Sequence, residues 1–113
     1  MRAFLIASAL LAGLPAQAAV SALNDYPTDA RADYVFACMK TDGDTHDALE
    51  RCSCSIDVIA SLLPYDAYVS GETVASMMQN VGAPGRAIMA SALAKAKLVT
   101  LRRAQAESEV RCF

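Results

Sequence analysis

The number and spacing of the cysteines constrain the fold of this chain more than any other feature. The chain contains four cysteines, and only one residue separates the middle two: Cys38, Cys52, Cys54 and Cys112. In a short exported chain an even number of cysteines indicates a disulfide framework. Two such bonds would each contribute roughly 2–4 kcal/mol to stability. A domain of this size buries a modest fraction of its surface, so we expect its fold to depend on them.

The start of the chain indicates export. Arg2 is followed by an apolar stretch over residues 4–14, and Ala16-Gln17-Ala18 resembles a signal-peptidase site. This stretch is too short to span a bilayer, which takes ~20 residues. We therefore predict a signal peptide at 1–18, cleaved after Ala18, and a single domain at 19–113 with no membrane span. A site of this kind on a short chain is typical of bacteria, so the expected location is the periplasm.

The remainder predicts an all-α fold, a compact bundle of about four helices with two disulfides. Alanines are frequent, and glycines and prolines punctuate the chain at short intervals. Four helices are expected. The first covers 28–40 with Thr28 as N-cap, and the second runs from 44 or 45 to 63. The third runs from Pro64 to about 81 with Gly71 as a weak point, and the fourth from 86 to 106. Their apolar spacing predicts an inner face on the first helix, formed by Ala32, Val35, Phe36 and Met39, and a core stripe on the second, formed by Leu49, Cys52, Ile56, Ile59 and Leu63. The third helix carries the apolar residues Tyr68, Val69, Val74, Met77, Met78 and Val81. On the fourth, the residues expected to face inward are Ile88, Met89, Leu93, Ala96 and Val99.

Cys52 and Cys54 would point to nearly opposite sides of one helix, because two residues correspond to about 200° of rotation. They are therefore not expected to bond to each other. We favour Cys38–Cys52 with Cys54–Cys112, because Cys52 lies nearer to the turn before its helix, while Cys38–Cys54 with Cys52–Cys112 stays open. A Cys-x-Cys pair could instead bind copper(I) or act in thiol redox chemistry. The absence of a thioredoxin-like strand pattern favours structural disulfides.

A second candidate site is an acidic turn with four carboxylates within nine residues: Asp42, Asp44, Asp47 and Glu50. Carboxylate oxygens are ligands for calcium and lanthanide ions. The spacing is not that of an EF-hand. The favoured interpretation is that Asp44 caps a helix and that Asp47 and Glu50 lie along the positive end of that helix. His46 is the only histidine, so no catalytic triad can be assembled and we expect no enzyme activity.

Charge is distributed unevenly along the chain. Residues 25–72 hold ten acids and three bases, whereas residues 73–113 hold two acids and six bases. The basic part lacks interleaved aromatic residues, so nucleic acid is not an expected partner. Another periplasmic protein is the expected partner, with a homodimer as a further option. Tyr65 and Tyr68 form an aromatic corner whose expected role is packing.

Two short motifs, Cys52-Ser53-Cys54-Ser55-Ile56-Asp57 and Leu63-Pro64-Tyr65-Asp66, carry a family resemblance. The stretch 35–78 resembles small exported proteins of methylotrophic bacteria, the landiscernin-like group, which accompany quinoprotein alcohol dehydrogenases and lanthanide handling. The resemblance implies a periplasmic accessory or metal-trafficking protein. The first expectation is therefore a non-catalytic accessory or binding protein, and the second is a lanthanide or calcium carrier that uses the acidic turn. The third is a copper(I) or thiol-redox protein that uses Cys52 and Cys54.

Overall fold

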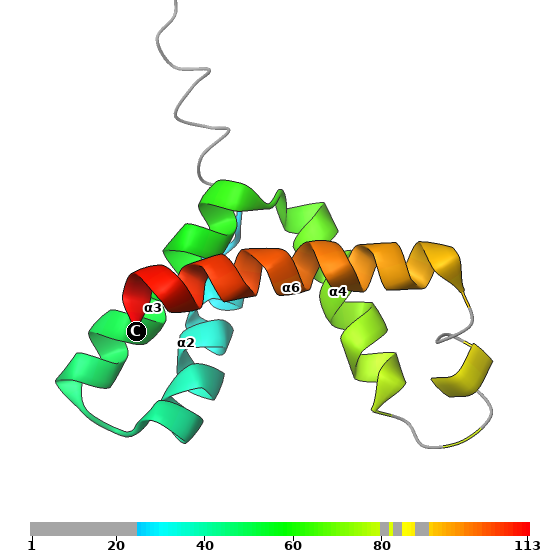
Figure 1. Ribbon diagram of the computed structural model, residues 1–113. Coiled ribbons are helices and arrows are strands. Elements are labelled where there is room, and N and C mark those ends of the chain that lie inside the picture. Colours follow the sequence, from blue (N-terminus) through cyan, green and yellow to red (C-terminus); the bar gives the residue numbers. More distant parts are fainter. Residues whose placement is uncertain (1–24, 80–81, 83–84, 88–90) are drawn as a thin grey trace, which may run out of the picture.

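A computed structural model describes residues 25–79, 82, 85–87 and 91–113, so the predicted signal peptide at 1–18 lies outside the described residues. The main helices are α2 (Thr28–Asp42), α3 (His46–Leu62), α4 (Tyr65–Met78) and α6 (Ala92–Cys112). α2 and α3 form an antiparallel hairpin, α4 diverges from the end of α3, and α6 crosses both α3 and α4 (Figure 1). The predicted all-α bundle of about four helices is confirmed.

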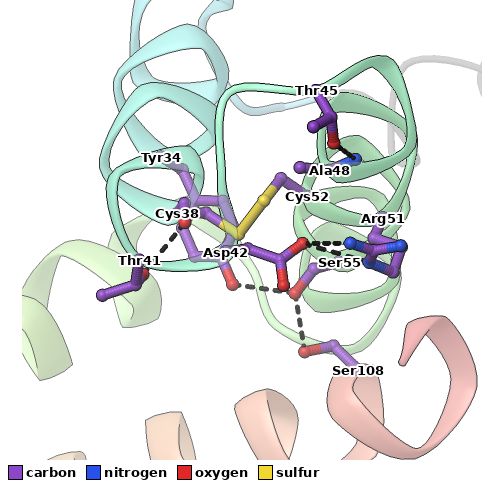
Figure 2. The surroundings of a disulfide bond; sticks show 10 residues. All are labelled: Tyr34, Cys38, Thr41, Asp42, Thr45, Ala48, Arg51, Cys52, Ser55 and Ser108. Carbon is purple, nitrogen blue, oxygen red and sulfur yellow. Dashed lines mark hydrogen bonds and ion pairs between the residues drawn. A yellow bond between two sulfur atoms is a disulfide. The ribbon is translucent and has the colours of Figure 1, made fainter.

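Both disulfides have the favoured pairing. The hairpin disulfide joins Cys38 of α2 to Cys52 of α3, and the long-range disulfide joins Cys54 of α3 to Cys112 of α6. The Cα atoms are 5.8 Å apart in each bond. The hairpin disulfide crosses directly between its two helices (Figure 2). The two neighbouring cysteines therefore fasten α3 to a different helix on each flank.

Local capping defines the hairpin. Gly43 has φ 120°, a left-handed conformation that favours glycine, and its N–H donates to the Met39 carbonyl at 2.9 Å. The Thr45 hydroxyl then accepts from Ala48 N at 3.1 Å and begins α3, so Thr45 caps this helix and Asp44 does not. The expected cap at Thr28 was also wrong. Pro27 holds that position, because its extended backbone lets its carbonyl accept from Arg31 N.

The core lies between α3, α6 and the aromatic corner. On α3 the expected residues Cys52, Ile56 and Ile59 are buried, as is Leu63 just after the helix. Tyr26, which is not among the residues predicted above, is only 4% exposed and donates from its hydroxyl to the Leu63 carbonyl at 2.8 Å. Its ring centroid lies 5.1 Å from that of Tyr65 and 5.2 Å from that of Tyr68. The corner thus packs against the core, as expected.

Several expected inward faces are exposed instead. α2 buries none of its residues, and Phe36 is 63% and Leu49 of α3 40% exposed. On α4, Val74 is buried whereas Val69 and Met77 are exposed. The spacing locates apolar stripes on α2, α3 and α4, but the helices in the described part of the chain are too few to cover all of them. Val81, an apolar residue of the expected third helix, lies outside the described residues.

The inward face of α6 was predicted wrongly. Leu93, Ala96 and Val99 are exposed, and the buried residues are Leu101, Ala104 and Ser108. α6 begins at Ala92, where the Ser91 hydroxyl accepts from Ala94 N, and it runs beyond Ala106 to Cys112. Because apolar and charged residues are spread around α6 without a clear apolar stripe, tertiary contacts choose its inner face. Ile88 and Met89 lie outside the described residues.

Gly71 is buried where α4 crosses α6. A Cβ added at this position would lie 2.7 Å from Leu101 Cβ and 3.2 Å from the Lys97 carbonyl oxygen. The glycine predicted to weaken the helix is therefore what permits the close approach of the two helices.

Candidate functional site

The acidic side chains of the turn have separate roles, in ion pairs and at the start of α3. Asp42 accepts from Arg51 Nε at 3.0 Å and from the Arg51 terminal nitrogen at 2.8 Å, and Glu50 pairs with His46 Nε2 at 3.2 Å. Asp47 lies in the first turn of α3. Among the described residues, no three His, Cys, Asp or Glu side chains form a group that could hold a metal ion. The structure thus does not bring the four predicted ligands together.

The four cysteines provide no thiol in this structure, because all of them are in disulfides. A copper(I) site or a redox pair at Cys52 and Cys54 would require reduction of both bonds. In the oxidised protein these residues serve as cross-links between helices.

A cavity of about 480 Å³ opens between α2, α4 and the C-terminal part of α6. Its lining includes one carboxylate or more from each of these helices: Asp33, Asp42, Glu72 and Glu109. A second hollow of about 520 Å³ shares Asp33, Tyr68 and Glu72 with it and adds Asp29. No basic side chain is among the described residues that line either hollow. We call this pair of hollows the acidic cavity.

Two side chains of the acidic cavity, Glu72 and Tyr68, have pKa values shifted by their surroundings. Burial raises the pKa of Glu72 above its ordinary value, and the nearby Arg102 only partly opposes this effect. Burial also raises the pKa of Tyr68, and the Glu72 and Asp33 charges raise it further. Asp33 of α2 and Glu72 of α4 thus both lie near Tyr68, so a cation that entered the cavity would meet acidic side chains from two helices.

Three hydroxyls form a directed chain that begins in the wall of the acidic cavity. Ser108 donates to the Gln105 carbonyl at 2.7 Å, so it accepts from Ser55 at 3.0 Å, and Ser55 in turn accepts from Tyr34 at 2.8 Å (Figure 2). Ser55 and Ser108 are each 1% exposed, and Tyr34 lines the cavity. Because each buried hydroxyl is both donor and acceptor, the chain leaves neither serine unsatisfied and fixes α2, α3 and α6 to one another.

The residues of the acidic cavity were not predicted as a site, apart from Asp42. Asp29 and Asp33 are four residues apart, a spacing that places both on one face of a helix. This was the only local signal. Glu72 and Glu109 join them through the crossing of α4 and α6, which the spacing of acids along the chain does not reveal.

The fold and the cavity together define a small all-α domain cross-linked by two disulfides, a class of bond typical of exported proteins. Searched against known proteins, the chain matches no protein-family model, no curated protein and no solved structure. No helix in the described part of the chain is both long and apolar enough to cross a bilayer.

Proposed function

We propose that this protein is a non-catalytic periplasmic accessory protein that binds a partner protein by receiving a basic side chain of that partner in the acidic cavity. The observation that carries the proposal is the lining of the cavity, which presents carboxylates from three helices and no basic residue among the described ones. A lysine or arginine side chain matches this charge.

The shape and the walls of the cavity support a side chain of this size. Its volume of about 480 Å³ exceeds what a single dehydrated ion fills, and Tyr34, Tyr68 and Phe113 add aromatic surface. Aromatic rings attract both ammonium and guanidinium groups. The carboxylates differ in availability, because Arg51 already neutralises Asp42 whereas Asp33 and Glu109 are exposed. Asp33 and Glu109 are therefore the side chains that we expect to meet the partner's cation.

The test is a titration of the oxidised protein, followed by NMR, with a lysine- and arginine-rich peptide and with an acidic peptide of equal length. The basic peptide should bind, should shift signals from the cavity, and should weaken as salt rises. The double variant Asp33→Asn/Glu109→Gln should bind it about five-fold more weakly or worse.

The matched control is Asp44→Asn/Asp47→Asn, which removes the same charge from two residues that do not line the cavity. This control should bind the basic peptide as the wild type does. Equal losses in both variants would show an effect of net charge alone and would overturn the proposed site. The same protein titrated with calcium and lanthanum salts tests the metal carrier, since tight ion binding lost in the control variant would replace this proposal.

A further inference from the structure

A second and chemically different surface follows the seam between α2 and α3. A groove of about 460 Å³ is lined mainly by apolar side chains of the two helices: Ala32, Val35, Phe36, Met39, Leu49 and Ile56. None of its lining residues lines the acidic cavity. Phe36 projects from it with 63% of its surface exposed. An exposed apolar groove on a small domain is typical of an interface.

The apolar residues of the groove have the spacing of helix-on-helix packing. Val35 and Met39 follow Ala32 at intervals of three and four residues, and Ile56 follows Leu49 by seven. This repeat is what an aligned helical surface needs in order to interdigitate. The surface that would cover the groove is therefore itself a pair of helices with apolar stripes of the same kind.

The edges of the groove carry opposite charges. Arg31 and Lys40 are on the α2 edge, and the Lys40 ammonium lies 4.4 Å from the centre of the Phe36 ring. Asp57 is on the α3 edge, and Glu50 lies two turns before it on the same face of the helix. Thus α2 has a basic edge and α3 an acidic edge.

These charges are also level with one another across the seam. The hairpin disulfide brings residues 38 and 52 to the same height, so Lys40 and Glu50, each two residues nearer the connecting turn, are level. At the other end Arg31 contacts Asp57 directly at 2.7 Å. Each basic residue on the edge of α2 therefore has an acidic residue at the same height on the edge of α3.

We propose that the groove binds a second copy of this chain, related by a two-fold axis parallel to α2 and α3. That axis places α2 of each copy over α3 of the other, with Lys40 opposite the partner's Glu50 and Arg31 opposite the partner's Asp57. A two-fold axis perpendicular to the helices would instead place α2 over α2 and bring Arg31 near the partner's Lys40. The like charges disfavour that arrangement, so the edges select the first axis.

The first test is the oligomeric state of the oxidised protein, measured by sedimentation velocity over a concentration series. We expect a reversible dimer for the wild type, and a rise of about 30-fold or more in the dimer Kd for Phe36→Ser. The matched control is Val110→Ser on α6, which is 83% exposed, lies outside the groove and should leave the Kd unchanged. Because Phe36 is exposed, far-UV circular dichroism should show the same helix content in all three proteins. A wild type that stays monomeric, or equal effects of the two substitutions, would overturn the proposal.

The second test uses charge reversal. Lys40→Glu and Glu50→Lys should each dimerise more weakly than the wild type, because each places like charges together at both symmetric contacts. An equimolar mixture of the two variants should form heterodimers. In a heterodimer the glutamate introduced at position 40 of one chain faces the lysine introduced at position 50 of the other, and the two native residues, Lys40 and Glu50, face each other at the second contact. If the loss came from a contact broken within one chain, adding the other variant would not restore association. Failure of the mixture to associate more strongly than either variant alone would refute this geometry.

Discussion

The crossing of α4 and α6 predicts that replacing a helical glycine by alanine will destabilise this protein. On an ordinary helix position this substitution stabilises by about 1 kcal/mol, because alanine is the better helix former. At Gly71 the new Cβ would lie 2.7 Å from Leu101 Cβ and 3.2 Å from the Lys97 carbonyl oxygen. Neither atom can rotate away, since one is attached directly to the backbone and the other is part of it.

The size of the effect follows from that geometry. Ordinary carbon contacts are about 3.5–4.0 Å, so the helices must separate by roughly 1 Å at their crossing. Overpacking of this kind costs about 1–3 kcal/mol, and the upper value applies where backbone has to move. After the gain in helix propensity, Gly71→Ala should lower the free energy of unfolding by about 2 kcal/mol and the Tm by about 10 °C.

The assay is thermal and urea unfolding followed by circular dichroism at the helix band. The matched control is Thr73→Ala, an exposed position of the same helix, which changes helix propensity without adding an atom at the crossing. Its stability should equal or exceed that of the wild type. A Gly71→Ala variant as stable as the wild type, or more so, would refute the close approach of α4 and α6.

Three further predictions concern the cross-links and the buried polar groups. Loop-closure entropy makes the long-range disulfide, with a separation of 58 residues, worth about 4 kcal/mol. The hairpin disulfide, with a separation of 14 residues, is worth about 3 kcal/mol. Urea unfolding of variants with both cysteines of one bond replaced by alanine should therefore show the larger loss of stability for the long-range disulfide. Ser55→Ala interrupts the hydroxyl chain and should cost about 1–3 kcal/mol in the same assay, whereas Ser53→Ala, on the partly exposed side of α3, should cost little. Burial raises the pKa of Glu72, so the folded chain holds this proton more tightly than the unfolded chain does. The free energy of unfolding should therefore fall as pH rises through the titration range of Glu72, and Glu72→Gln should reduce that fall; an unchanged pH profile would contradict the burial argument.

Local signals accounted for the helices and the cysteine pairing. The rotation between Cys52 and Cys54 required two different partners, and the nearness of Cys52 to the turn selected Cys38. These are arguments about one helix and its immediate neighbour. They hold because an α-helix has a fixed geometry whatever it packs against.

The faces that are buried, and the acidic cavity, depended on long-range packing. The exposed stripe on α2 has the same spacing as a core stripe, and only the position of α6 shows that nothing in the described part of the chain covers it. Glu109 of α6 lies near Asp33 of α2 in the cavity lining. The long-range disulfide holds the end of α6 against α3, and Gly71 lets α6 pass close to α4. Such a cluster comes from tertiary structure, so no pattern in consecutive residues predicts it.

In a chain exported with its N-terminus first, the long-range disulfide would be the later of the two bonds to form. Cys38, Cys52 and Cys54 of such a chain reach the oxidising compartment while Cys112 is still to follow. Three thiols then compete for one bond, and the hairpin turn at Gly43 and Thr45 brings the correct pair together. An early Cys38–Cys54 bond would leave Cys52 and Cys112 to join on the wrong flank of α3. Correcting such a bond would require disulfide isomerisation, which takes seconds to hours.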